Sequence, residues 1–113
     1  MDDCLFCKIV RKEISAKEVF RDELVVAFHD INPVAPVHIL VIPTKHATHL
    51  SEFSAQRNGS ATSGLLDACA AVGKKFAPQG YRIVANEGVD GGQTVPHLHF
   101  HVLGGRHMTW PPG

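Results

Sequence analysis

Three histidines alternate with apolar residues near the end of the chain, in the segment PHLHFHVLGG. His97, His99 and His101 stand at every second position, so an extended strand would point all three to one face and their apolar neighbours to the other. Adjacent imidazoles repel one another when protonated, and they stabilise a strand no better than Thr or Val would. The spacing therefore indicates a functional site, either a metal site or a nucleophilic imidazole whose neighbours set its tautomer and receive protons.

A glycine-rich stretch, NEGVDGGQT, comes directly before the histidines. Gly91 and Gly92 permit backbone conformations in which successive N–H groups converge on an anion, and Gln93 and Thr94 add side-chain donors. Glycine turns between strands are more often plain hairpin connections. Beside three imidazoles, however, this turn predicts a phosphate group held next to a nucleophile.

Two of the three cysteines, Cys4 and Cys7, form a C-x-x-C motif. A redox C-x-x-C usually lies in a βαβ unit, and the first residues of this chain show no such pattern. A zinc site instead needs about four ligands. We favour zinc, with further ligands drawn from His46, His49 and His97. The alternative is two reduced cysteines that pack as small hydrophobic residues.

Short strands and few helices must position these residues. Runs of β-branched and aromatic residues predict strands, here listed by residue number: 19–20, 24–28, 37–43, 81–88 and 97–105. A short helix is expected near residues 4–14, and a long one from Ser60 to the break at Pro78, with Cys69 on its apolar stripe. Residues 51–60 are expected to form a loop. These elements predict the α+β class, with both helices on one face of a mainly antiparallel sheet and the histidines exposed on the other.

Composition bounds the class of partner. The 113 residues fit a single domain, residues 1–113, whose small core would gain from association with another copy. Lys plus Arg and Asp plus Glu each number 11, without the basic stripe that nucleic-acid binding requires. No apolar stretch approaches the ~18 residues of a membrane-spanning helix, and no export signal precedes the fold. We therefore expect a soluble cytoplasmic protein without nucleic-acid or membrane partners.

Three stretches together resemble the histidine triad (HIT) superfamily: DINPVAPVHILVIP, NEGVDGGQTVPHLHFHVLGG and WPPG. The last two resemble its Hint branch of purine nucleoside phosphoramidate hydrolases, and the resemblance covers essentially the whole chain. It implies a five-stranded sheet with one long and one short helix, and a homodimer in which two sheets join into a continuous ten-stranded one. The tail, residues 104–113, would pack at the edge of the dimer and the active site.

The resemblance also implies a reaction on the α-phosphorus of a nucleotide. His99 would attack to give a nucleotidyl-histidine, which water cleaves to release AMP or GMP, with no metal needed for the chemistry. The implied catalytic residues are His99, His101, His38 and Thr94. The implied nucleotide-binding residues are Asp30, Ile31, Phe6, Phe28, Asn86, Gly92, Gln93, Thr94 and His101.

The C-x-x-C resembles the zinc site of bacterial members of this branch. The implied ligands of a structural zinc ion are Cys4, Cys7, His46 and His97. One departure stands beside the triad, where Pro96 occupies a position that is usually aromatic in Hint relatives.

Other functions remain compatible with the same residues. The triad could bind a catalytic ion in a metal-dependent hydrolase. The pocket could serve a nucleotide-binding adaptor without turnover, and a nucleotidyl transferase would need an acceptor site that so short a chain does not reveal. A labelled adduct on His99, the metal content of a His99→Ala variant and turnover relative to that variant separate these alternatives.

Overall fold

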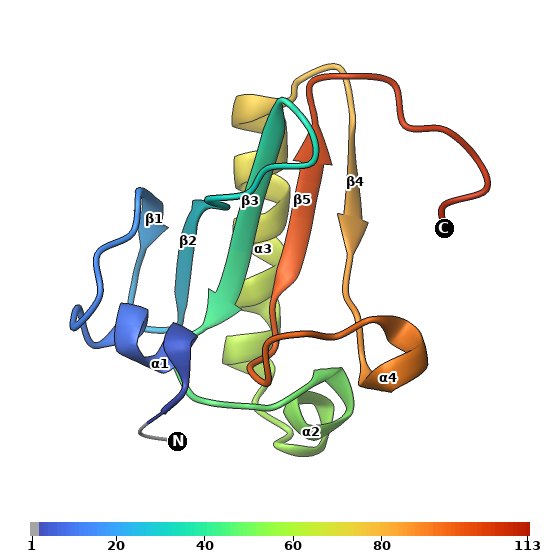
Figure 1. The fold of residues 1–113 in the computed structure, drawn as a ribbon. Helices are drawn as coiled ribbons and strands as arrows, with labels where there is room; N and C mark the ends of the chain where they lie inside the picture. The colour runs from blue at the N-terminus through green and yellow to red at the C-terminus, as the bar shows by residue number, and fades with distance from the viewer. Residues whose placement is uncertain (1–2) are drawn as a thin grey trace.

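One antiparallel sheet of five strands forms the centre of the molecule (Figure 1). The structure is a computed structural model that describes residues 3–113. The strand order is β1-β2-β3-β5-β4, and every neighbouring pair is antiparallel. The strands are β1 (Glu18–Arg21), β2 (Val25–His29), β3 (Val37–Pro43), β4 (Tyr81–Val84) and β5 (Phe100–Gly104). The predicted α+β class and five-stranded sheet are confirmed.

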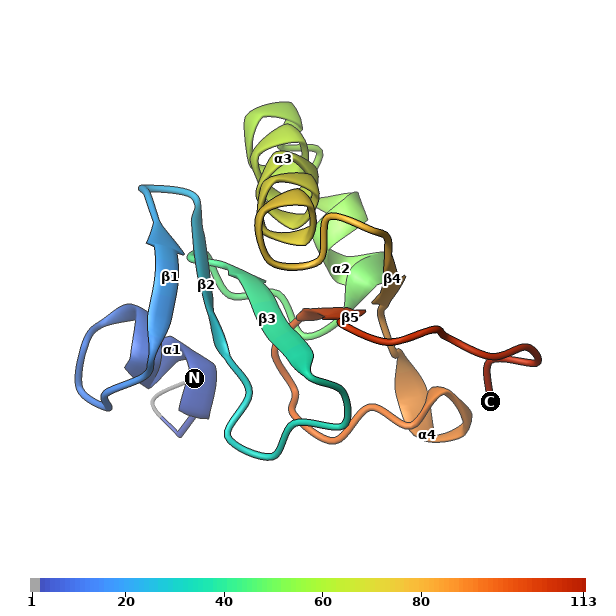
Figure 2. The same ribbon diagram turned by 90° about the horizontal axis from the view of Figure 1, so that it is seen from above.

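Helices α1 (Leu5–Val10) and α3 (Gly59–Phe76) lie on opposite sides of this sheet (Figure 2). The expectation that both cover one face is wrong. Strands β2 and β3 explain why, because the side chains of nearly all their residues are buried and each face therefore needs a cover. Alternate residues such as Val25 and Ile39 pack under α3, whereas Val26 and Leu40 pack with α1.

The long helix begins and ends close to its predicted bounds. Asn58 caps its start, where the side-chain oxygen accepts a hydrogen bond from the Ala61 N–H at 3.1 Å. Its apolar stripe faces the sheet, and Cys69 is buried there, as expected. Pro78 follows the end of the helix, in keeping with its inability to continue one.

Two short helices occur where the sequence predicts irregular chain. α2 (Leu50–Ala55) replaces the expected loop, and α4 (Gly88–Gly91) replaces part of the glycine-rich turn. α2 has only six residues and one buried side chain, Phe53, which is too little for a helical periodicity, yet His49 caps it by accepting a hydrogen bond from the Glu52 N–H at 3.2 Å. α4 ends at Gly92, whose φ of 78° suits a residue without a side chain.

The last strand begins at Phe100, later than the predicted residue 97. Residues 97–99 lie outside the ladder, with a bend at His97, and the Leu98 N–H donates to the Ala47 carbonyl at 2.7 Å. The predicted alternation holds, since Leu98 and Val102 belong to the core under α3. The expected exposure of the histidines is wrong: His97 is 0% and His99 is 6% exposed, because the first helix covers their face.

The C-terminal segment after β5 extends away from the body of the molecule (Figure 1). Arg82 of β4 holds it, donating to the Thr109 carbonyl at 2.9 Å, and the guanidinium lies 6.0 Å from the centre of the Trp110 ring. Trp110 itself is 80% exposed. Among the described residues, no helix combines the length and apolar character needed to cross a membrane.

Candidate active site and metal centre

The backbone determines which nitrogen of His97 carries a proton. Its Nε2 lies 3.0 Å from the carbonyl oxygen of Pro43, and because a carbonyl only accepts, Nε2 carries the hydrogen and donates. The lone pair therefore resides on Nδ1. That atom points at three others, the Sγ atoms of Cys4 (3.3 Å) and Cys7 (3.5 Å) and Nδ1 of His46 (3.2 Å).

These four residues form a compact cluster that we call the closed cluster: Cys4, Cys7, His46 and His97. Their donor atoms all lie within 4.8 Å of one another, and Cys7 Sγ is 3.2 Å from Nδ1 of His46. Two sulfur and two imidazole donors fit a tetrahedral cation such as Zn²⁺. Burial together with the hydrogen bond and charge of Cys4 raises the pKa of the Cys7 thiol to about 11, a penalty on the thiolate that a cation would reverse. The four ligands implied by the sequence are thus brought together.

His99 has the opposite arrangement. Its Nδ1 lies 2.8 Å from the carbonyl oxygen of His97, so Nδ1–H donates and the lone pair resides on Nε2. The ring is buried between an edge contact with Phe6, at 5.2 Å between ring centres, and the ring of His101, at 4.9 Å. A neutral imidazole held in this tautomer offers a nucleophilic nitrogen without a separate base.

A second chain of hydrogen bonds joins β3 to β5. The backbone N–H of Val34 donates to Nδ1 of His38 at 3.1 Å, so the hydrogen of a neutral His38 is on Nε2. That Nε2 lies 2.9 Å from Nδ1 of His101 and 3.3 Å from Oδ2 of Asp30. His101 therefore accepts from His38 and carries its own hydrogen on Nε2. We call Asp30, His38, His99 and His101 the open cluster.

Burial favours the neutral form of three histidines in the two clusters, His38, His97 and His101. Burial lowers the pKa of His101 to about 4, and the nearby charges of His99 and His38 lower it further. Burial also lowers the pKa of His38, against a smaller opposite effect from Asp30. In His97, burial is again the main cause of a pKa of about 4. At neutral pH these three imidazoles are therefore uncharged.

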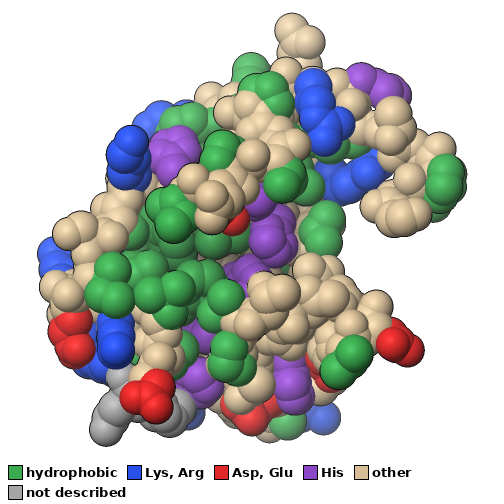
Figure 3. Space-filling view, in the orientation of Figure 1, with side chains coloured by type: hydrophobic (Ala, Val, Ile, Leu, Met, Phe, Trp, Pro, Cys, Tyr) green, Lys and Arg blue, Asp and Glu red, His purple; other side chains and the backbone are tan. Residues whose placement is uncertain are grey.

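The implied nucleoside residues lie beside the open cluster. Phe6 and Phe28 meet edge to face at 5.6 Å between ring centres and are buried, whereas Ile31 is 90% exposed. Asp30 and Ile31 line a surface hollow of about 520 Å³ together with His38. In the space-filling view, histidine side chains lie in a depression flanked by hydrophobic residues (Figure 3). Asp30 and Ile31 thus border this hollow, whereas Phe6 and Phe28 lie buried away from it.

The glycine-rich loop is held mainly by its own hydrogen bonds. The Gly92 N–H donates to the Val89 carbonyl at 3.0 Å, and the side-chain amide of Gln93 donates to the Thr48 carbonyl at 2.6 Å. Thr94 is exposed, and Asn86 follows β4 at a position level with His99 if the β4 and β5 register is extended. The roles of these four residues in phosphate binding stay predictions.

Sequence reasoning missed the backbone groups that orient the imidazoles, namely the carbonyls of Pro43 and His97 and the N–H of Val34. The Pro43 carbonyl reaches its ring from 54 residues away, whereas the other two groups lie within four residues of theirs, and side-chain patterns carry no signal of any of the three. Glu87 was also missed. Its carboxylate accepts from the N–H and hydroxyl of Ser51, each at 2.9 Å, and so ties α2 to the loop that contains α4.

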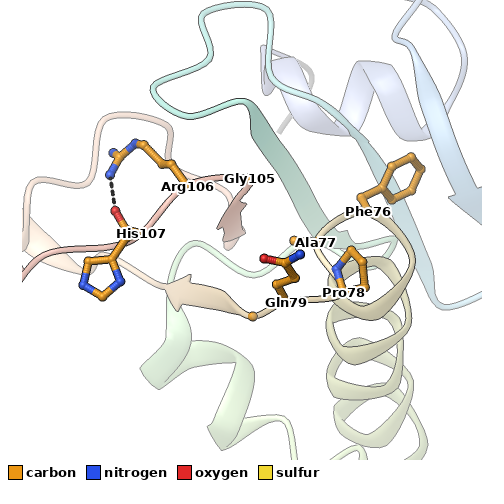
Figure 4. A pocket seen from close by; sticks show the side chains of 8 residues that line it. Phe76, Ala77, Pro78, Gln79, Gly105, Arg106 and His107 are labelled. Carbon is orange, nitrogen blue, oxygen red and sulfur yellow. Dashed lines mark hydrogen bonds between the residues drawn. The ribbon is translucent and has the colours of Figure 1, made fainter.

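Three histidines lie outside both clusters, and His49, a candidate zinc ligand from the sequence, is one of them because it caps α2 instead. His29 contacts the ring of Phe76 at 5.7 Å. His107 lines a hollow of about 470 Å³ at the end of α3, where its carbonyl accepts from Arg106 at 3.1 Å (Figure 4). Neither the triad nor a cysteine lines that hollow, so it carries no part of the candidate chemistry.

Comparison with known proteins agrees with this geometry. The chain is 47% identical over 112 residues to an uncharacterized HIT-like protein of Synechococcus elongatus, covering 99% of this chain and 98% of that protein. It is 46% identical to a 14 kDa zinc-binding protein of Zea mays, covering 96% and 87% of the two chains. The crystal structure of a HIT family hydrolase from Legionella pneumophila superposes with a TM-score of 0.92 at 42% identity, covering 98% of this chain and 100% of that one. The HIT domain family model matches residues 11–108, which include the entire triad, and the chain therefore belongs to the HIT family.

Proposed function

We propose that this protein hydrolyses the P–N bond of purine nucleoside 5′-phosphoramidates through a nucleotidyl intermediate on His99. The observation that carries the proposal is the hydrogen bond of 2.8 Å from Nδ1–H of His99 to the His97 carbonyl, which leaves Nε2 as the nucleophile. Similarity to proteins named HIT family hydrolases supports hydrolase chemistry. The substrate class extends the resemblance noted in the sequence.

The reaction divides into two displacements at phosphorus. The substrate nitrogen takes a proton from solvent, Nε2 of His99 forms a bond to the phosphorus while the P–N bond breaks, and the neutral amine departs beside the hydroxyl of Thr94. Water then attacks the phosphorus and gives a proton back to solvent, the bond to Nε2 breaks, and the nucleoside monophosphate is released. The His97 carbonyl stabilises the imidazolium by accepting from Nδ1–H, and Nε2–H of His101 is available to a phosphoryl oxygen.

We propose that the closed cluster holds structural zinc. The four donors fit the ion, and the relative from Zea mays is named a zinc-binding protein. Zinc would cross-link the first turn of α1 to residues 46 and 97, thereby fixing the residue whose carbonyl orients His99. It takes no part in either displacement.

Asp30, His38 and His101 of the open cluster form a poor catalytic metal site, although their ligand atoms are close enough for one. The Val34 N–H donates to Nδ1 of His38, which leaves a hydrogen on Nε2, the atom nearest to His101 and Asp30. Coordination through Nε2 would move that hydrogen to Nδ1, where it would face the Val34 N–H. The hydrogen bonds therefore favour a nucleophilic histidine over a metal-dependent hydrolase.

We further propose a cytoplasmic homodimer that brings the tail of one chain to the site of the other. Trp110 is 80% exposed although Arg82 holds the segment, and β4 is an edge strand with Tyr81 and Ile83 each more than a third exposed. Burial against a second copy would cover these residues. The three free cysteines suit a reducing compartment.

Steady-state hydrolysis of adenosine 5′-phosphoramidate by the wild type and a folded His99→Ala variant tests the function. We expect turnover in the wild type alone, and a phosphorus-labelled histidine adduct when the reaction is quenched early. Tight binding of AMP with equal, negligible turnover in both proteins would contradict the proposal and favour the nucleotide-binding adaptor.

A further inference from the structure

Cys4 and Cys7 are placed so that they can bond to each other as well as to a metal. Cys4 caps α1, and the backbone N–H of Cys7 donates to its Sγ at 3.3 Å. The two sulfur atoms lie within 4.8 Å of one another. Residues three apart in a helix have Cβ atoms about 5–6 Å apart, and a disulfide needs about 4 Å. A small tightening of the first turn is therefore enough to join them.

Solvent has a route to this pair. A surface hollow of about 410 Å³ is lined by Cys4 and His46, together with Thr48 and Thr94. The hollow gives a molecule as small as a hydroperoxide access to Cys4, although the residue as a whole is only 9% exposed. The third cysteine, Cys69, is 4% exposed and lies in the core between α3 and the sheet, which makes it an internal control.

We propose that Cys4 and Cys7 are a site of oxidation by hydroperoxides, and that the disulfide they form releases the zinc. One thiolate attacks the terminal oxygen of the peroxide; an S–O bond forms, the O–O bond breaks, and the other oxygen leaves as water after taking a proton. The second thiolate attacks the new sulfenic sulfur, an S–S bond forms, and hydroxide leaves and takes a proton. Two thiolates and one peroxide thus give one disulfide and two waters, with two protons consumed and Zn²⁺ freed.

Oxidation would reach the open cluster through one residue. Nδ1 of His97 points at both sulfur atoms, while the carbonyl of the same residue accepts from His99. Once the sulfur atoms bond to each other, the cation no longer holds the His97 ring, and the carbonyl that fixes the His99 tautomer loses its anchor. This second step rests on the proposed function, whereas the oxidation itself does not.

The test exposes the zinc-loaded full chain to hydrogen peroxide and follows zinc with a colorimetric chelator, free thiols, and peptide masses. We expect release of one zinc ion per chain, loss of two of the three thiols, and a peptide spanning residues 4–7 that is lighter by two hydrogen atoms. A dithiol reductant with added zinc should reverse all three changes. The Cys69→Ala variant should release zinc at the same rate with no thiol left.

Several outcomes would overturn the oxidation site: retention of zinc and thiols under excess peroxide, a disulfide between chains, or sulfinic acid without a disulfide. The coupling to His99 is measured separately as turnover of adenosine 5′-phosphoramidate, which should fall by about tenfold or more on oxidation and recover on reduction with zinc. Unchanged turnover in the disulfide form would overturn the coupling. Absence of turnover before oxidation would contradict the proposed function, while the zinc and thiol data still decide the oxidation site.

Discussion

The closed and open clusters use the same residue type, and they differ in where its lone pairs point. In the closed cluster the Pro43 carbonyl accepts a hydrogen bond from His97 Nε2–H, so the lone pair on Nδ1 faces two sulfur atoms. In the open cluster the His97 carbonyl accepts a hydrogen bond from His99 Nδ1–H, so Nε2 carries no hydrogen. The side chain alone does not decide whether a histidine binds a metal or attacks a phosphorus; the backbone group beside it does.

The clusters also differ in enclosure. Three of the four residues of the closed cluster are buried. The open cluster adjoins a surface hollow, and Ile31 on its rim is almost fully exposed. The closed cluster meets a hollow of about 410 Å³ at Cys4 and His46, whereas the hollow beside the open cluster, about 520 Å³, is lined by Asp30 and His38 and could serve as an entrance for a substrate.

The largest expected effect is on turnover, and it distinguishes a catalytic open cluster from a metal-binding closed cluster. His99→Ala should lower turnover on the order of 10⁴-fold or more, because it removes the attacking atom, while the protein keeps one zinc per chain. His46→Ala should do the reverse, losing zinc while turnover falls by only about tenfold. Metal analysis of both purified variants beside their rates provides the measurement. Loss of zinc from His99→Ala would mean that the triad itself is the metal site.

Removal of the metal should lower stability more than any other treatment. A ligand bound only by the folded state, at a free concentration a thousand times its dissociation constant, adds about 4 kcal/mol to the free energy of unfolding. We expect a strong chelator to lower the wild-type urea midpoint accordingly. The His46→Ala variant is the matched control and should not respond to the chelator, and an equal shift in both proteins would contradict the closed cluster as the zinc site.

The neutral histidines predict a loss of stability in acid. The pKa of His101 is about 4 in the fold and about 6.5 when the chain unfolds, so the unfolded state takes up the proton first. Stability should therefore fall as the pH drops from about 6.5 towards 4, by well under 1.4 kcal/mol per pH unit for this half-buried ring. Urea titrations at several pH values measure the slope.

His101→Asn is the control for this slope, since its side-chain oxygen can still accept from His38 but does not titrate. Both proteins would lose zinc in acid, so this contribution cancels when the free energy of unfolding of one is subtracted from that of the other at each pH. We expect the variant to have the shallower dependence on pH, and parallel curves would show that His101 is not buried as the structure has it.

Much of the fold could be predicted because it depends on local pattern. The alternation around Leu98 and Val102 placed the histidines on one face, and β3 matched its predicted residues 37–43. The position of α1 could not be predicted, because burial of β2 on both faces becomes clear only when the sheet is assembled. α2 was missed for a related reason, since one buried residue, Phe53, makes no periodicity.

The candidate site divides in the same way. The C-x-x-C motif and the resemblance to the HIT family implied the zinc ligands, whereas the tautomer of His97 depends on the Pro43 carbonyl, which is 54 residues away in sequence. Proline at position 43 ends a strand in the sequence pattern, and nothing there shows that its carbonyl orients a histidine. Strand pairing supplies this information.

The smallest expected effect concerns the entrance of the open cluster. Deleting residues 110–113 should leave the melting temperature unchanged, because Trp110 is 80% exposed and contributes little to the core. If the tail reaches the site of a partner chain, the deletion should change the ratio of kcat/KM between bulky and small amine leaving groups by about fivefold, the size of one aromatic contact. Arg82→Ala keeps the tail but removes its hold on Thr109 and Trp110, so it should shift the ratio in the same direction and by less. If this ratio of kcat/KM values is unchanged in a variant that still sediments as a dimer, the tail of the partner chain plays no part in substrate selection.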